Sequence, residues 1–415
     1  MKSKINNMVV FYLYLLLITL LEVILFIPLL IILRLTGMKG RLGFGISSRQ
    51  KSIWFHAASM GEVNALKPLL IKTAEQFGAE RIVLTTMTST GLLTAAKIDL
   101  PITVSYLPLD FPIIMSLFFK RIAPQIIVIM ETEFWPQMLF QAKLRDIPVI
   151  MVNARLTANS FSKYLGTRLF WHEPWLAIKT INAQSDSDQK RFRELGFNHV
   201  RNCGNLKFAI DLPDHANIDK YSKYGVSDED FVLTVGSSRP GEEQLIREIY
   251  PHLKKEIPNL KLIIAPRHLK RIEEVKAIFA GQKAVVLSEL IIHTDYDILI
   301  IDSIGLLTEI YSFSDLVIVG GSFTDYGGHN PLEAAYYSKP VIMGIYHSSC
   351  RESVNRLLEK QGIFITGQQD LLKKILELYN DHDLRINTGK NARNVLVNNA
   401  HSLEENLDTI KSFLE

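Results

Sequence analysis

Cysteine is scarce in this chain of 415 residues, which carries two, Cys203 and Cys350. Two thiols so far apart in the sequence build neither a disulfide framework nor a cysteine-rich metal site. A charge imbalance is also missing, because the net charge of +3 is too small for the basic footprint of a nucleic-acid binder. Zinc-ligand spacings, a Walker loop and a nucleophile elbow are absent as well. We therefore predict a reduced, cytosolic catalytic body with no metal, no cofactor and no nucleic-acid partner.

One long hydrophobic run stands apart from this globular composition. Residues 9–33 are apolar except for Glu22, and about 20 such residues suffice to cross a bilayer as a helix. A buried helix of a soluble domain is the alternative, and Glu22 and Pro28 also leave room for a kinked or re-entrant segment. The basic flank after the run is the heavier one, which favours a cytoplasmic body. Its cations, which could also meet anionic lipid headgroups, are Arg34, Lys39, Arg41, Arg49 and Lys51.

After this segment, short apolar strands alternate with helical stretches. The predicted strands of the first half are SIWFHAA, RIVLTTMT, QIIVIMETE, IPVIMVNAR and KTINAQS. Those of the second half are FVLTVGSS, KLIIAPRH, KAVVLS, YDILIID, LVIVGG and KPVIMG. Apolar strands separated by helices indicate parallel sheets covered on both faces. The fold class is therefore α/β, with two doubly wound domains facing a cleft at the carboxyl ends of their strands.

A polar stretch separates the two sets of strands. We expect a membrane anchor over residues 1–35, a first domain over 36–210, a linker over 211–230 and a second domain over 231–415. The length fits this division, because 415 residues are too many for one ordinary core.

The most informative motif is GGSFTDYGGHNPLEAA, at 320–335, where paired glycines follow a predicted strand. Asn330 resembles a helix N-cap, Pro331 a first helical residue and Glu333 the third position of a capping box. Exposed amides at a helix start favour phosphate or nucleotide binding, although a well-capped helix explains the same residues. Arg267, in APRH, could grip phosphate at another strand end, or lie in a surface turn.

Acidic and basic residues of the first half have two interpretations each. Glu62, in WFHAASMGE, is either a general base or a favourable acid at a helix start. Glu131 and Glu133 have the alternate spacing of one strand face, although an acid pair at a helix start fits as well. Lys207, in GNLKF, could face the cleft or the solvent.

Taken in order, the motifs resemble those of the Kdo (3-deoxy-D-manno-octulosonic acid) transferases of lipopolysaccharide synthesis. The resemblance covers nearly the whole chain and rests on the apolar N-terminal segment, WFHAASMGE, TTMTSTG, YLPLD, METEFWP, NARLT, AQSDSD, GNLKF, APRH and GGHNPLE. It implies the GT-B glycosyltransferase architecture, CMP-Kdo as donor and lipid IVA, the lipid A precursor, as acceptor. It also implies the cytoplasmic side of the inner membrane.

Matched by motif, Glu62 takes the position of the family's proton acceptor, and Glu131 and Lys207 take those of an acid and a lysine that stabilise the transition state. The segments that match CMP-contacting ones are Pro266 and Arg267, then Ile304, Gly305 and Leu306, then Asn330, Pro331, Leu332 and Glu333. Leu306 stands where many relatives have Glu, and GSSRPGEE replaces a commoner STH-type stretch.

The resemblance implies an inverting transfer with no enzyme nucleophile, and Glu62 taking the proton of the acceptor hydroxyl. Two alternatives stay open at this point. One is a GT-B enzyme that uses another nucleotide sugar, such as a UDP-sugar transferase or epimerase. The other is a non-enzymatic, membrane-anchored protein that binds a nucleotide.

Overall fold

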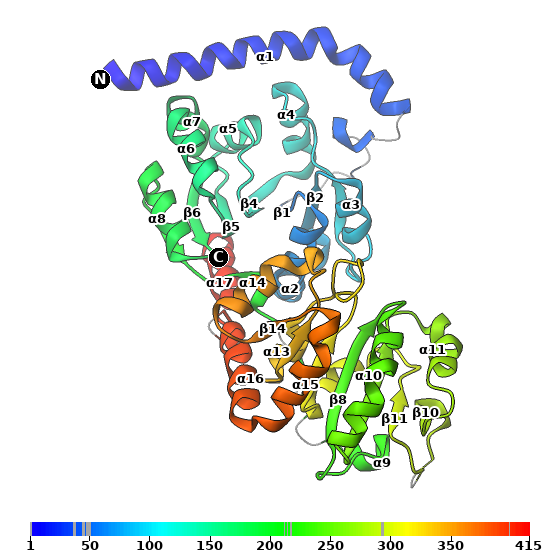
Figure 1. Cartoon of the computed structure of the whole chain (residues 1–415). Helices are drawn as coiled ribbons and strands as arrows, with labels where there is room; N and C mark the ends of the chain where they lie inside the picture. Colours follow the sequence, from blue (N-terminus) through cyan, green and yellow to red (C-terminus); the bar gives the residue numbers. More distant parts are fainter. Residues whose placement is uncertain are drawn as a thin grey trace. The chain divides into compact units, whose positions relative to one another are not determined.

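The computed structural model describes residues 2–35, 39–43, 46, 51–210, 212–213, 215, 218–291, 294–397 and 399–415 (Figure 1). Two compact units divide the chain. Unit 1 comprises Met1–Ala209 together with Asn399–Glu415, and unit 2 comprises Ile210–Asn398. Each unit has its own parallel sheet and its own buried core, as the two sets of predicted strands indicate.

Over its described residues, unit 1 is built on one parallel sheet of seven strands in the order β3-β2-β1-β4-β5-β6-β7. The strands are β1 (Ser52–His56), β2 (Ile82–Thr86), β3 (Thr103–Tyr106), β4 (Pro124–Met130), β5 (Val149–Ala154), β6 (Ile178–Ala183) and β7 (Val200–Asn202). Its helices are α1 (Lys2–Leu35), α2 (Met60–Phe77), α3 (Ser89–Ala95), α4 (Pro112–Ile122), α5 (Pro136–Leu144), α6 (Ala158–Gly166), α7 (Arg168–Trp175), α8 (Asp186–Leu195) and α17 (Ser402–Leu414).

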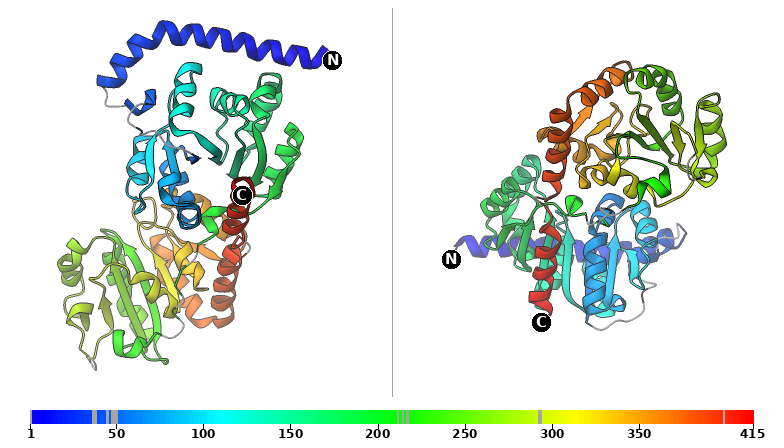
Figure 2. Two further views of the ribbon diagram at one scale, coloured as in Figure 1. Left: turned by 180° about the vertical axis from the view of Figure 1, so that it is seen from behind. Right: turned by 90° about the horizontal axis from the view of Figure 1, so that it is seen from below.

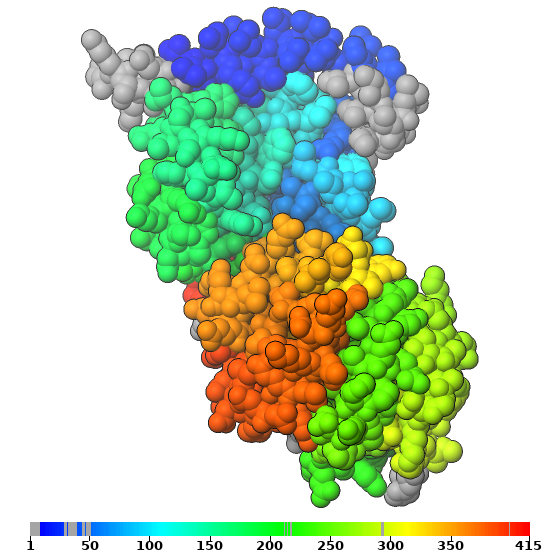
Figure 3. Space-filling view, viewed as in Figure 1, coloured from blue at the N-terminus to red at the C-terminus, as the bar shows by residue number. Residues whose placement is uncertain are grey.

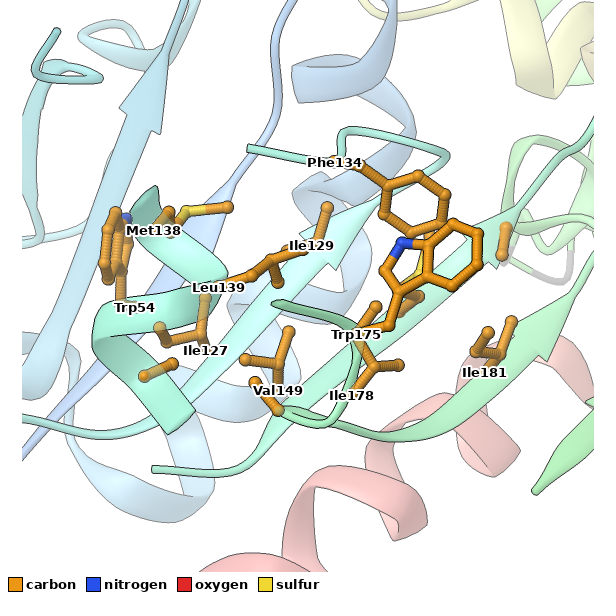
Figure 4. Close-up of a cluster of buried hydrophobic side chains, with 14 of the residues drawn as sticks. Trp54, Ile127, Ile129, Phe134, Met138, Leu139, Val149, Trp175, Ile178 and Ile181 are labelled. Atoms are coloured by element: carbon orange, nitrogen blue, oxygen red, sulfur yellow. The ribbon is translucent and has the colours of Figure 1, made fainter. Parts of the chain in front are cut away.

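Both faces of this sheet are buried, as its continuous apolar strands require. One face packs against α4, α5 and α7, and its core includes Trp54, Ile127, Phe134 and Trp175 (Figure 4). The other face packs against α2 and α17, with Leu407 of α17 among the buried residues. Two covered faces leave the strand ends as the places where polar side chains can gather.

Helix α1 lies over helices α4, α5 and α7 in unit 1 (Figures 1 and 2). Residues Val9–Pro28 are long and apolar enough to cross a membrane, yet only 11% of that stretch is buried. The buried part includes Phe11, whose ring lies 4.8 Å from that of Phe140 and 5.6 Å from that of Phe170 between centroids. The apolar segment is therefore a helix docked on unit 1 along one side.

Over its described residues, unit 2 also has seven parallel strands, in the order β10-β11-β9-β8-β12-β13-β14. They are β8 (Phe231–Ser238), β9 (Leu260–Pro266), β10 (Ala284–Val286), β11 (Ile298–Ile300), β12 (Leu316–Val319), β13 (Val341–Met343) and β14 (Ile363–Ile365). Its helices are α9 (Lys220–Tyr224), α10 (Glu242–Glu256), α11 (Ile272–Ile278), α12 (Leu307–Phe313), α13 (Leu332–Tyr336), α14 (Arg351–Glu359), α15 (Leu371–Asn380) and α16 (His382–Val397).

The predicted α/β class and the predicted strands are confirmed, and three further strands were not predicted. These are β3, β7 and β14, which lie at sheet edges and have three or four residues each. All three strands are short and partly exposed, so none has the long apolar run that identifies a central strand.

The predicted domain boundaries differ from the division into units at two places. Part of the predicted linker folds as α9, and Tyr224 at its end is fully buried in the core of unit 2. At the C-terminus, α17 belongs to unit 1 rather than to the second domain. Leu403, Leu407 and Ile410 bury the apolar side of α17 in the core of unit 1.

Candidate active site

The candidate acids of unit 1 flank the point where the sheet changes direction. From β1 the chain first builds β2 and β3 on one side, and then β4 to β7 on the other. Glu131 directly follows β4, and Glu62 lies in the first turn of α2, after β1. In open parallel sheets, ligands bind at this switch point, outside the carboxyl ends of the strands. The sequence prediction that these motifs gather at strand ends is therefore matched by the fold.

The carboxylate of Glu62 is held by its own loop. The Ala58 N–H donates to Glu62 Oε2 and the Ser59 hydroxyl to Glu62 Oε1, both at 2.8 Å. Ser59 is in turn the N-cap of α2. Burial raises the pKa of Glu62, and the charge of Glu131 adds to this, whereas the two hydrogen bonds and Lys207 oppose it. Since each carboxylate oxygen keeps a second lone pair, Glu62 can still accept a proton.

Glu131 forms an ion pair with Lys207, with 3.0 Å between Nζ and Oε1. The predicted strand-face arrangement of Glu131 and Glu133 is wrong, because β4 ends at Met130 and both acids lie in the turn before α5. Glu131 has a φ of 56°, in the left-handed region that side chains rarely adopt. Strain of this kind concentrates at functional sites, where the surrounding structure fixes the backbone.

Three asparagines position the loop of Lys207. The buried Asn153, which also has a positive φ of 52°, accepts the Leu206 N–H at 2.9 Å. Asn205 accepts the Lys207 N–H at 2.9 Å through its side chain. Asn399, which precedes α17, accepts the Asn205 N–H at 2.8 Å. The loop is therefore held from β5 and from the returning C-terminal segment, which sequence reasoning did not predict.

Glu133 is a further candidate, to which the motif match assigns no role. Burial, together with the charges of Glu62 and Glu131, raises its pKa to about 7, although a 3.1 Å hydrogen bond from Trp135 Nε1 lowers it. Three carboxyl groups with interacting charges thus share the switch point with one lysine. A carboxyl pKa near neutrality suits proton transfer, and no sequence pattern predicts it, because it depends on burial.

A carboxylate cap fixes the element that follows these acids. Asp110, the last residue of YLPLD, accepts the N–H groups of Gln137 and Met138, each at 2.9 Å. These are orphan donors at the start of α5, whose own N-cap position is Trp135 and provides no side-chain bond. Because α5 begins three residues after Glu133, this cap restrains the turn that carries Glu131 and Glu133.

In unit 2, the predicted CMP-contacting residues also gather at one edge of the sheet. Pro266 ends β9 and Arg267 follows it, while Ile304 and Gly305 lie in the turn between β11 and α12. The sheet changes direction between β8 and β12, and the glycine-rich loop follows β12. Ile304 is 87% exposed, and Gly305 has a φ of 90°, which suits glycine. Leu306 is partly buried and packs against the apolar core under α12.

The glycine-rich loop uses the amides of its first part internally, so these are not open to an anion. The buried carboxylate of Glu242 accepts the N–H groups of Gly321, Ser322 and Phe323 at 2.8 to 2.9 Å. The Gly328 and His329 N–H groups donate to carbonyls of the same loop. Glu242, the first residue of α10, therefore binds the amides that directly follow β12, whereas the phosphate prediction concerns the segment from Asn330 to Glu333.

The predicted helix start at Asn330 is displaced by one residue. Asn330 Oδ1 accepts the Leu332 N–H at 3.2 Å, as a cap does, but α13 begins at Leu332 and Pro331 stands at the N-cap position. The described helix has only five residues, so its dipole is small. Glu333 is half-buried, and this burial raises its pKa while Arg267 opposes the rise. Charge on side chains, rather than a helix end, is left to attract an anion here.

Arg239 supplies such a charge, and the sequence prediction did not include it. The residue follows β8 and directs its guanidinium to two histidines, with 2.8 Å from Nη1 to His268 Nε2 and 3.3 Å from Nε to His329 Nε2. Burial and the neighbouring cations lower the pKa of His329 to about 4. Among the described residues, neither Arg239 nor Arg267 has a carboxylate within ion-pair distance. Two arginines beside two neutral histidines thus form a cationic edge suited to phosphate or carboxylate.

Comparisons with known proteins match both parts of the chain to known families. A family model described as 3-deoxy-D-manno-octulosonic-acid transferase (kdotransferase) matches residues 36–210, and one described as glycosyl transferases group 1 matches residues 222–395. The 3-deoxy-D-manno-octulosonic acid transferase of Haemophilus influenzae is 31% identical over 392 residues, covering 92% of this chain and 92% of the relative. The enzyme of the same name from Rickettsia felis is 31% identical over 91% of this chain and 83% of its own.

Among solved structures, MurG from Acinetobacter baumannii has a TM-score of 0.53 at 15% identity, covering 87% of this chain and 99% of MurG. At this identity the likeness shows only the fold, which is GT-B. The curated relatives identify the activity class, because they match at 31% identity over almost the whole chain. The chain is therefore a glycosyltransferase and belongs to the 3-deoxy-D-manno-octulosonic acid (Kdo) transferase family.

Proposed function

We propose that this enzyme transfers Kdo from CMP-Kdo to lipid IVA, with inversion at the anomeric carbon and with Glu62 as the general base. The observation that carries the proposal is the group of acids at the switch point of unit 1. There the carboxylate of Glu62, with a raised pKa, lies beside the Glu131–Lys207 ion pair. Family membership supports Kdo as the transferred sugar, and CMP-Kdo is the activated form that the sequence resemblance implies.

Glu62 has the features that a proton acceptor needs. A sugar hydroxyl is a poor nucleophile, and a nearby carboxylate takes its proton while the new bond to the Kdo carbon forms. The raised pKa makes Glu62 a stronger base than an ordinary glutamate, and the bonds from Ala58 and Ser59 orient its oxygens. The bond from the Kdo carbon to the phosphate oxygen breaks in the same step. A single displacement on this route inverts the carbon.

Lys207 and the arginines of unit 2 stabilise the negative charge that develops. Lys207 is held by its loop and paired with Glu131, so its ammonium group has a fixed position at the acidic site. The departing CMP phosphate gains charge, and Arg267 is proposed to bind it with Pro266, Ile304, Gly305 and the segment from Asn330 to Glu333. Arg239 joins this set because its guanidinium lies against His268 and His329. In this proposal, side-chain cations stabilise the charge of the departing phosphate, as helix N-termini do in other enzymes.

The acceptor places the reaction at a membrane. Lipid IVA remains in a bilayer, and α1 offers an apolar surface on unit 1, the unit that carries Glu62. We assign the enzyme to the cytoplasmic side of the inner membrane, since the basic flank after residue 33 favours a cytoplasmic body. An anchor raises the local concentration of a lipid acceptor that cannot diffuse through water.

The test compares the purified enzyme with its Glu62→Gln variant, using CMP-Kdo, lipid IVA and mass spectrometry of the lipid product. Loss of a general base lowers the rate by roughly a hundred- to ten-thousand-fold. The variant should keep its affinity for CMP, which calorimetry measures separately, because Glu62 belongs to unit 1. Near-normal turnover by the folded variant removes Glu62 from the mechanism. Protection of the enzyme by UDP but not by CMP refutes the proposed donor.

A further inference from the structure

We infer that α1 lies flat in one leaflet of a bilayer, fixed to unit 1 by Glu22, and does not span the membrane. The inference deepens the proposed membrane location and depends on it for its biological setting. The residues that carry it are Glu22, which reaches α4, and Phe11, which reaches α5 and α7. Both lie on the side of α1 that faces unit 1, in a helix whose described remainder is largely exposed.

Glu22 caps another helix. Its carboxylate accepts the N–H groups of Ile113 and Ile114, both at 2.8 Å, and the side chain is 1% exposed. These are orphan donors in the first turn of α4, whose own N-cap residue, Phe111, has no polar side chain to offer. A carboxylate at a helix start also meets the positive end of the dipole. The one acidic residue of the apolar segment is therefore a fastening point and not a defect in a membrane span.

Two fastening points determine the direction of the helix. Phe11 and Glu22 are eleven residues apart, or about 16 Å along a helix at 1.5 Å per residue. Because both contact unit 1, the intervening stretch runs along the surface of unit 1 instead of projecting from it (Figures 1 and 3). A span through the bilayer would draw Glu22 and the start of α4 towards the hydrocarbon centre, where a carboxylate is expensive.

The exposed side of α1 is apolar over a wide arc. The exposed large side chains are Val9, Val10, Tyr12, Leu13, Leu16, Leu17, Leu20, Leu21, Val23, Ile24, Phe26, Ile27 and Ile31. At 100° per residue these positions cover roughly 220° of the circumference. A partner helix, or a second copy of this chain, covers a narrower stripe of a helix surface than this arc. Acyl chains, in contrast, can contact the whole surface of α1 that unit 1 leaves exposed. An isolated interfacial helix normally has one polar face beside its apolar face. In α1, the side that corresponds to the polar face is covered by unit 1.

The neighbouring helices continue this surface. Ile113 and Leu117 of α4 and Leu169 of α7 are exposed, and both of these helices contact α1. Across residues 157–175, the exposed charged side chains are Lys163 and Arg168, while Glu173 is buried in an ion pair with Lys143. Exposed cations beside an apolar band match the anionic headgroups that border acyl chains. The surface thus fits a leaflet that contains anionic lipid.

A depth scan tests the inference. Nitroxide labels are attached to single cysteines at Leu13, Leu17, Leu20 and Ile24 in a Cys203→Ser, Cys350→Ser background. The proteins are bound to vesicles of phosphatidylethanolamine and phosphatidylglycerol. Oxygen and an aqueous nickel chelate then report the depth of each label. We expect the same shallow depth, about 5–10 Å below the headgroups, at all four positions.

Three outcomes overturn the inference. They are a depth that changes steadily along the helix, labels that stay in water, and spin–spin broadening from a second copy. The scan measures the depth of α1 in the bilayer and does not require enzyme turnover. Its result is therefore the same whether or not the proposed donor and general base are correct.

The fastening point has its own measurement. In Glu22→Ala, the amides of Ile113 and Ile114 should exchange with deuterium at least about tenfold faster, since both lose a charged acceptor. Thr19→Ala is the matched control, because the Thr19 hydroxyl bonds to Leu15 within α1 and not to α4. Equal exchange in the two variants contradicts the role of Glu22.

Discussion

Replacing Glu133 by glutamine is expected to stabilise unit 1 in alkaline solution and to leave it unchanged in acid. Burial and the charges of Glu62 and Glu131 raise the pKa of Glu133 from an ordinary value of 4.5 to about 7. An unfolded chain ionises this group from pH 4.5 upward, whereas the folded protein retains the proton until about pH 7. Folding is therefore penalised increasingly between these values, and fully above the higher one. Glutamine stays neutral and can still accept the hydrogen bond from Trp135.

The size of the effect follows from the shift. The difference between 7 and 4.5 is about 2.5 pKa units, which at about 1.4 kcal/mol per unit gives an upper limit of about 3 kcal/mol. Glu133 is partly exposed, and solvent screening reduces the expected gain at pH 8 to about 1–2 kcal/mol. For a unit of this size, that corresponds to a rise of roughly 2–8 °C in melting temperature.

Tryptophan fluorescence is the suitable assay, because Trp54, Trp135, Trp171 and Trp175 are the four tryptophans of the chain and all belong to unit 1. Melting curves of the protein and of Glu133→Gln are compared at pH 4.5 and pH 8. Glu75→Gln, on the exposed side of α2, controls for the loss of one charge. Equal stabilisation at both pH values, or a lower melting temperature at pH 8, refutes the reasoning.

Three further predictions concern residues that bind the donor or support the loops of the two candidate sites. Arg239→Ala should weaken CMP-Kdo binding by about ten- to a hundredfold, because a charged hydrogen-bond donor is lost. Arg239→Lys should recover part of the affinity. Unchanged affinity in calorimetry excludes Arg239 from the donor site. Asn399→Ala should lower the stability of unit 1 by about 1–2 kcal/mol, since the Asn205 N–H loses its acceptor. Turnover should slow while CMP affinity stays constant. Normal turnover by this variant shows that the loop of Lys207 does not need the contact with Asn399. Gly320→Ala should disrupt the glycine-rich loop, because a Cβ would lie 2.6 Å from the Ser237 carbonyl oxygen and 2.8 Å from Glu242; normal CMP affinity and a normal melting curve contradict this.

Sequence patterns predict the central strands well and the edges poorly. QIIVIMETE forms β4 because a run buried on both faces is apolar throughout. The β3 strand, with the sequence TVSY, is only partly buried and carries no such signal. The sequence also predicts the apolar segment, and it associates Glu22 with a kinked or re-entrant helix rather than with a contact. The role of Glu22 depends on the start of α4, some ninety residues away, which local patterns do not reveal.

The candidate site likewise contains residues that the sequence predicts and residues that it does not. Residue types at strand ends indicated Glu62, Glu131 and Arg267, because parallel strands bring their carboxyl ends to one edge. The pKa of Glu133 depends on burial, and the contacts of Arg239 depend on two histidines from other loops. The contact of Glu242 with the amides of Gly321, Ser322 and Phe323 is equally hidden from the sequence, because it joins the start of α10 to a loop some eighty residues away.

The return of the chain to unit 1 through α17 has a consequence for how the protein forms during synthesis. Unit 1 is begun first, yet residues 399–415 complete it only after the whole of unit 2 has been made. Until then, Asn182 lacks Asn406 and Thr409, its hydrogen-bond partners on α17, and the Asn205 amide lacks Asn399. Domains normally fold in order as they leave the ribosome. Here the N-terminal unit is completed after unit 2, so the loop that carries Lys207 receives its final support only once residues 399–415 have been made.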